Sequence, residues 1–171
     1  MKIECTIDGK NIVLNVNSNK PLSLILTDEL ESGPSLSSCN NESHGSCMVL
    51  VNEEVVLASL VPAFRLRGAK ITTFTAYQKS RFWHDLERAY EDTGSHPCPN
   101  CYASKSLIFE SLLQGVGKVD LSQDSEEQTE EENIVREVRL NSCPCLDAHE
   151  IIDIYKAAAT YRKRRRGVRR Y

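Results

Sequence analysis

Neither a long apolar run nor a familiar catalytic motif occurs in this sequence of 171 residues. No window offers the roughly 18 uninterrupted apolar residues of a membrane span. The start, MKIECTIDGK, lacks the apolar segment of a secretory signal. G-x-S-x-G, P-loop and dinucleotide-binding fingerprints are absent, and the histidines show no zinc-protease spacing. We therefore expect a cytoplasmic protein that makes no membrane contact and has no substrate-transforming centre of its own.

The cysteine content argues against a disulfide framework. There are 7 cysteines, and an odd number cannot pair completely. Disulfides are also rare in a reducing cytoplasm. Metal binding is therefore the leading explanation for the cysteines.

The pattern of apolar residues divides the chain near residue 77. Before that point short strands are predicted at 3–7, 12–16, 48–51, 54–60 and 71–77, with a turn at Asp8-Gly9 and a helix at 21–31. After it, helical spacing predicts helices at 80–94, 102–117, 131–140 and 146–166. The expected fold is α+β, a small mixed sheet followed by a four-helix bundle.

Charge is distributed unevenly in the second half. Residues 120–132 carry seven acidic groups and no basic one, and residues 156–171 carry eight basic groups and no acidic one. The acidic run predicts a solvated linker over 118–133. The basic tail contains more cations than a helix C-terminus requires, so docking to an acidic partner or to nucleic acid stays open.

Two close cysteine pairs carry the strongest chemical signal. PCPNC contains Cys98-x2-Cys101 and SCPC contains Cys143-x-Cys145, each directly before a predicted helix. Four thiolates at one end of a bundle suit a [2Fe-2S] cluster or a structural zinc ion. The one-residue gap in the second pair leans toward a cluster, and four inert buried cysteines are the plainer alternative.

The order of these features resembles a known family. A β-rich half with a C-x7-C loop, the two later pairs, and the segments CMVLVNEEVVLASL, KITTFTAY and EEENIVREVRLNSCPC are similar to the small iron-sulfur subunit of the molybdenum hydroxylases. That family includes xanthine dehydrogenase and aldehyde oxidase. The resemblance implies a ferredoxin-type β-grasp domain at 1–77 and a [2Fe-2S]-binding four-helix bundle at 78–171. It also implies electron transfer from a molybdopterin-binding large subunit to a flavin subunit or another acceptor.

Carried over residue by residue, the resemblance implies one complete cluster site and one degraded site. The bundle site matches at Cys98, Cys101, Cys143 and Cys145, although CPNCYAS and CPCLD lack the family's glycines. In the ferredoxin-type loop, two ligand positions keep cysteine and two do not: Cys39 and Cys47 remain, whereas His44 and Ser59 stand where cysteines are expected. We therefore expect one [2Fe-2S] cluster, in the bundle, and loss of the other. An altered cluster, or zinc on Cys39, His44 and Cys47, are the alternatives.

Two functions compete on these observations. The first is an electron-transfer subunit with one working cluster, whose β-rich half serves mainly as a docking scaffold. The second is a zinc-stabilised interaction or nucleic-acid-binding protein derived from the same family. The four aligned cysteines favour the first, whereas the basic tail and the replaced ligands favour the second. We take the first as the prediction, with no nucleic-acid partner.

Overall fold

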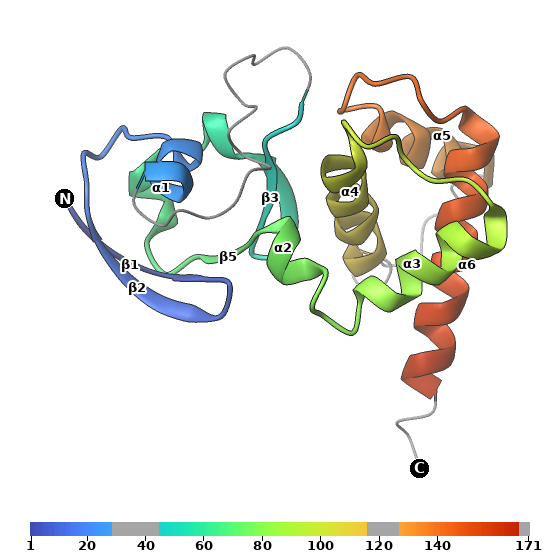
Figure 1. Cartoon of the computed structure of the whole chain (residues 1–171), viewed down its shortest axis with the longest axis horizontal. Coiled ribbons are helices and arrows are strands. Elements are labelled where there is room, and N and C mark those ends of the chain that lie inside the picture. The colour runs from blue at the N-terminus through green and yellow to red at the C-terminus, as the bar shows by residue number, and fades with distance from the viewer. Residues whose placement is uncertain (29–44, 116–126, 168–171) are drawn as a thin grey trace.

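The protein combines one mixed sheet with a set of packed helices. The computed structural model describes residues 1–28, 45–115 and 127–167. Within these ranges the sheet has five strands in the order β2-β1-β5-β3-β4 (Figure 1). The strands are β1 Lys2–Ile7, β2 Lys10–Asn15, β3 Met48–Val51, β4 Glu54–Leu57 and β5 Lys70–Thr72. The mixed α+β class expected from the sequence is thus confirmed.

The first hairpin follows from its turn residues. β1 and β2 pair antiparallel with Ile7 opposite Lys10. Asp8 and Gly9 both have positive φ, 51° and 81°, as a two-residue type I′ turn requires. The Asp8 carboxylate also accepts hydrogen bonds from the Thr73 backbone N–H and hydroxyl, both at 2.8 Å. This turn therefore ties the hairpin to the end of β5.

The chain after β5 differs from the prediction. Residues 71–77 were expected to be strand, but β5 ends at Thr72 and a short helix, α2 Phe74–Tyr77, follows. The Thr73 side chain caps this helix by accepting from the Ala76 N–H, and such capping overrides the β propensity of ITTFTAY. Likewise β4 ends at Leu57 instead of reaching residue 60, because Ala58–Leu60 form a 3-10 turn.

One hydrophobic core lies between the sheet and the helix α1 Leu22–Asp28. Alternate residues of β1, Ile3, Cys5 and Ile7, are all buried, as the two-residue period of a strand predicts. They pack in the same cluster as Leu22 and Ile25 of α1. Cys5 is thus a core residue of the sheet.

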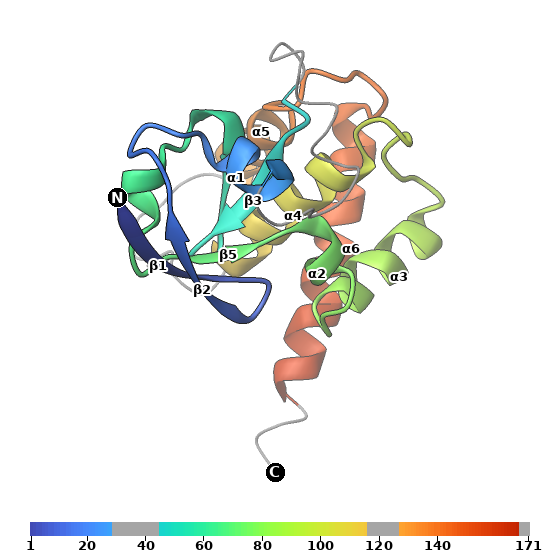
Figure 2. The same cartoon turned by 60° about the vertical axis from the view of Figure 1, so that its left-hand side comes forward.

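The second half is helical (Figures 1 and 2). Its elements are α3 Trp83–Thr93, α4 Tyr102–Gly115, α5 Glu127–Val138 and α6 Ala148–Gly167. Gly94 ends α3 with φ 68°, the left-handed conformation that favours glycine at this position. α5 begins at Glu127, so residues 127–133 of the expected linker are helical. The rest of that linker, 118–126, lies outside the described residues.

These helices bury a second core that reaches the sheet. α6 packs against α3, α4 and α5, and the shared cluster includes Leu86, Phe109 and Ile154. Met48 and Leu50 of β3 belong to the same cluster. Among residues 1–28, 45–115 and 127–167, no helix is long and apolar enough to cross a membrane.

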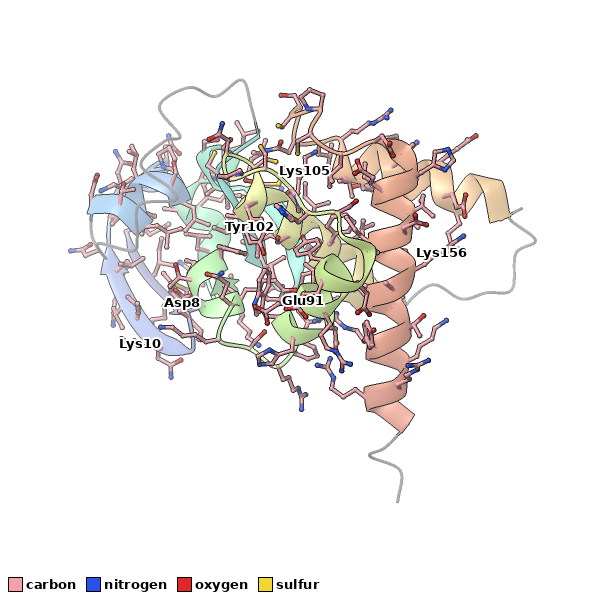
Figure 3. The ribbon with its side chains drawn as sticks, turned by 45° about the vertical axis from the view of Figure 1, so that its right-hand side comes forward. Asp8, Lys10, Glu91, Tyr102, Lys105 and Lys156 are labelled. Carbon is pink, nitrogen blue, oxygen red and sulfur yellow. The ribbon has the colours of Figure 1, made fainter. Side chains whose placement is uncertain are left out.

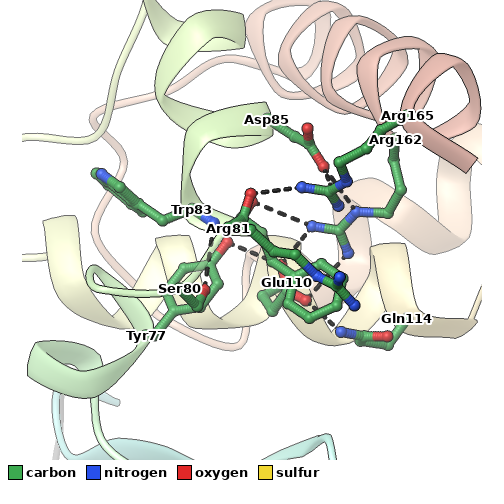
Figure 4. Close-up of polar contacts among 10 residues, drawn as sticks. Tyr77, Ser80, Arg81, Trp83, Asp85, Glu110, Gln114, Arg162 and Arg165 are labelled. Carbon is green, nitrogen blue, oxygen red and sulfur yellow. Dashed lines mark hydrogen bonds and ion pairs between the residues drawn. The ribbon is translucent and has the colours of Figure 1, made fainter. Parts of the chain in front are cut away.

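Three of the eight basic residues in the tail form ion pairs within the chain. Lys156, labelled in Figure 3, forms an ion pair with Glu131 of α5. Arg162 is only 3% exposed and binds both Asp85 and Glu110, and Arg165 also pairs with Asp85 (Figure 4). These cations hold α6 against α3, α4 and α5, which gives the tail a structural role that its sequence did not reveal.

Alkaline pH will destabilise the helical core through Tyr155. Burial, and secondarily the charge of Glu130, raises the pKa of Tyr155 to about 12, against about 10 in an unfolded chain. A raised folded-state pKa gives stability that is complete below pH ~10 and lost as the pH rises toward 12. Phenylalanine cannot ionise, so between pH 10 and pH 12 the unfolding free energy of Tyr155→Phe should decrease by roughly 2 kcal/mol less than that of the wild type. Urea unfolding at pH 10 and pH 12 measures this, and an unchanged slope would contradict the assignment.

Candidate metal centre

Four cysteine sulfurs meet at one end of the helical half. The Sγ atoms of Cys98, Cys101, Cys143 and Cys145 all lie within 4.8 Å of one another. The shortest separations are 3.2 Å between Cys101 and Cys145, and 3.5 Å between Cys98 and Cys101. Thiolates that share one tetrahedral metal lie about 3.8 Å apart when the metal–sulfur bonds are about 2.3 Å. The set therefore has the ligand type and spacing of a metal centre.

The local structure explains how two distant segments converge. Cys98 and Cys101 lie in a turn in which the Cys101 N–H donates to the Cys98 carbonyl at 3.0 Å, and α4 begins at the next residue, Tyr102. Cys143 and Cys145 lie in the loop between α5 and α6. The first pair directly precedes α4, and two residues separate the second pair from the start of α6 at Ala148. Helix N-termini carry free N–H groups and positive potential, which favour a thiolate-rich site.

The four thiols are not equivalent. Burial opposes ionisation of Cys98, but hydrogen bonds from the Cys101 and Asn100 backbone and contacts with neighbouring thiols lower the pKa of Cys98 to about 7. Burial raises the pKa of Cys101, which is 2% exposed, and burial also raises that of Cys143. A bound metal would deprotonate all four thiols and release their protons.

A layer of polar contacts holds the second cysteine pair in place. Asn141 is 1% exposed, and its side-chain oxygen accepts from the Cys143 N–H at 3.1 Å. Its amide group donates to the Gly45 carbonyl at 3.1 Å. A Cβ on Gly45 would lie 2.7 Å from the Leu140 carbonyl oxygen, so only glycine allows this close approach. The Ser104 hydroxyl adds a hydrogen bond to the Ser46 carbonyl at 2.9 Å.

Beneath this layer lies a buried cation that the sequence did not single out. Lys105 of α4 is 1% exposed. Its ammonium donates to the carbonyls of Val138 and Asn141 at 3.3 and 3.1 Å. One feature of the sequence could have predicted this burial. The segment SKSLIFESLL is mostly apolar, so its helix should be buried, and its charged residues then need polar partners.

The predicted ferredoxin-type site is only partly described. Cys39 and His44 lie outside the described residues. Cys47 and Ser59, the expected third and fourth ligand positions, do come together, because the Cys47 thiol contacts the Ser59 hydroxyl at 3.3 Å. Cys47 belongs to the core of the sheet and is 4% exposed.

Comparison with known proteins agrees with the predicted resemblance. No family model matches the chain. It is 22% identical over 153 residues to the 6-hydroxypseudooxynicotine dehydrogenase complex subunit beta of Paenarthrobacter nicotinovorans, covering 89% of each chain. It is 24% identical over 158 residues to caffeine dehydrogenase subunit gamma of Pseudomonas sp. (strain CBB1), covering 92% of this chain and 90% of that one.

Solved structures share the fold. Quinoline 2-oxidoreductase from Pseudomonas putida 86 contains a chain that matches with a TM-score of 0.68, 23% identity and 96% coverage of both chains. The aldehyde oxidoreductase of Desulfovibrio gigas matches with a TM-score of 0.69 and 22% identity, and there 96% of this chain covers 17% of the larger one. The chain therefore resembles the small iron-sulfur subunits of molybdenum hydroxylases, as its sequence predicts.

Proposed function

We propose that the chain is an electron-transfer subunit of a molybdenum-containing hydroxylase or dehydrogenase complex, with one [2Fe-2S] cluster in its helical half. The cluster ligands would be Cys98, Cys101, Cys143 and Cys145. The observation that carries the proposal is the convergence of these four sulfurs within 4.8 Å from two separate segments. When bound, such a cluster supplies reversible one-electron chemistry at a potential set by its surroundings.

The proposed organisation has two parts. Residues 1–77 would be a ferredoxin-type β-grasp domain that serves as a docking scaffold, and residues 78–171 a cluster-binding four-helix bundle. Two hydrophobic clusters support this division, one between the sheet and α1, and one centred on α3 to α6 that also takes in Met48 and Leu50 of β3. The proposed partner is a molybdopterin-binding large subunit, with a flavin subunit or another protein as electron acceptor. Both named relatives are subunits of dehydrogenases.

The exposure of the four cysteines suits exchange of electrons with a partner. Cys101 is buried, while Cys98, Cys143 and Cys145 are half-buried. A cluster there would be shielded from solvent on one side and reachable by a partner's redox group on the other. In contrast, the tail offers less cationic surface to nucleic acid than its sequence suggests, because Lys156, Arg162 and Arg165 are paired within the chain.

Metal analysis tests the proposal against the zinc alternative. The chain should be purified anaerobically together with its large subunit, and iron, acid-labile sulfide and zinc quantified per chain. The proposal predicts two irons and two sulfides per chain. One zinc with neither iron nor sulfide would instead support a zinc-stabilised interaction protein.

A second test concerns the ferredoxin-type loop. If that loop holds no cluster, the variants Cys47→Ala and Ser59→Ala will leave iron at two per chain, because the contact between these side chains requires no metal. A matched variant of the other site, Cys145→Ala, will lose its iron. The opposite result would be a wild-type chain with four irons that loses two of them in Cys47→Ala. It would mean that the ferredoxin-type loop still holds a cluster.

A further inference from the structure

The one buried lysine in the described part of the helical half lies behind the four cysteines, and the proposed relay does not use it. Lys105 follows Cys101 by one helical turn, and its backbone N–H donates to the Cys101 carbonyl at 2.9 Å. Its side chain crosses to the loop that carries the other pair, where the ammonium contacts the Asn141 carbonyl at 3.1 Å. Lys105, which is labelled in Figure 3, thus connects the backbones that present both cysteine pairs.

The partners of this ammonium leave its positive charge uncancelled. In residues 1–28, 45–115 and 127–167, it forms no ion pair with a carboxylate, and its partners are two backbone carbonyls. One of them belongs to Val138, the last residue of α5, where the helix dipole favours a cation. Burial of an unneutralised cation is costly. A concentrated negative charge nearby would offset this free-energy cost.

The four cysteines provide such a charge when they hold a metal. Asn141 lies two residues before Cys143, and two residues of chain span at most about 7 Å. The ammonium is therefore at most about 10 Å from the Cys143 backbone. At that separation and an effective dielectric constant of about 20, two unit charges change a binding or redox ratio roughly tenfold.

We propose that Lys105 is the counter-charge of the four-cysteine site, strengthening the binding of a metal there and raising the reduction potential of a cluster held there. The redox part rests on the proposed electron-transfer function. Reduction adds one electron to the site, supplied by the redox cofactor of the large subunit or by dithionite in solution. A fixed positive charge stabilises that added negative charge. Lys105 is thereby a positioning residue that also sets the potential.

Three variants separate charge from hydrogen bonding. Lys105→Gln keeps two N–H donors for the two carbonyls but removes the charge, Lys105→Met removes both, and Lys105→Arg keeps both. Lys163→Gln, on the exposed surface of α6, is the matched control for loss of a distant charge. Potentiometric titration of the cluster, followed by EPR in the whole complex, gives the readout.

We expect Lys105→Gln to lower the reduced-to-oxidised ratio at a fixed solution potential roughly tenfold, equivalent to about 59 mV for one electron. Lys105→Arg and Lys163→Gln should match the wild type. A Lys105→Gln cluster with the wild-type potential would overturn the inference and leave the proposed function intact. A wild-type chain with no reducible cluster would instead overturn the proposed function.

Cadmium binding gives a second readout if Lys105→Gln assembles no cluster. Cd²⁺ alone can be titrated into the metal-free chain and followed by thiolate-to-metal absorption. We expect at least about fivefold weaker Cd²⁺ binding by Lys105→Gln than by Lys105→Arg. Equal affinities would overturn the counter-charge role even in the absence of iron.

Discussion

Replacing Cys101 with alanine will empty the proposed cluster site. Cys101 is the most buried of the four cysteines, and its sulfur lies 3.2 Å from that of Cys145 and 3.5 Å from that of Cys98. Iron should fall from two per chain to near zero. Electron transfer from substrate to acceptor by the complex should fall by more than about 100-fold. Replacing a residue that only hydrogen-bonds to a metal ligand already lowers metal affinity or activity by about 10- to 100-fold.

Cys5→Ala is the matched control for this variant. Cys5 is also buried, at 5% exposed, but it packs in the core of the sheet. Its replacement should leave the iron content unchanged and lower the unfolding free energy by about 1 kcal/mol. A Cys101→Ala chain that retains two irons and a reducible centre would contradict the assignment of the ligands.

Replacing Arg162 with methionine will cause the largest expected loss of stability. The guanidinium donates to both carboxylate oxygens of Glu110, at 3.0 and 2.7 Å, and to Asp85 at 3.2 Å (Figure 4). Glu110 is 1% exposed and also accepts from the Tyr77 hydroxyl at 2.8 Å. Without Arg162 this carboxylate is buried with no opposite charge in contact, which costs roughly 3–5 kcal/mol.

Urea unfolding of three variants tests this expectation. Lys163→Met, the exposed neighbour on α6, should change the unfolding free energy by less than about 0.5 kcal/mol. Combining Arg162→Met with Glu110→Gln should recover part of the loss, since the uncompensated charge is then removed. An Arg162→Met chain within about 1 kcal/mol of the wild type would show that the network contributes little.

The sequence predicts those structural features that are determined by residues close together in the chain. Asp8-Gly9 specifies its hairpin turn because both residues tolerate positive φ, and Gly94 ends its helix for a similar reason. The four cysteines could be grouped because each pair directly precedes a helical pattern. Their spacing predicts a metal centre without any knowledge of the packing.

Features that depend on tertiary contacts could not be read in the same way. Arg162 stands in a run of basic residues that would ordinarily be exposed, and only packing buries it against Glu110. The apolar helix around Lys105 predicts that this residue is buried, but only packing supplies its carbonyl partners. Thr73 belongs to a β-rich run, yet its contacts with Asp8 and its cap on α2 end the strand. In each case long-range hydrogen bonds outweigh the local propensity.

Spin quantification by EPR tests the central claim most directly. The wild-type chain, purified anaerobically with its large subunit and reduced with dithionite, should give one S = 1/2 signal that integrates to one spin per two irons and one spin per chain. Absence of any signal together with one zinc per chain would contradict an electron-transfer function. Two spins per chain would contradict the loss of the ferredoxin-type cluster.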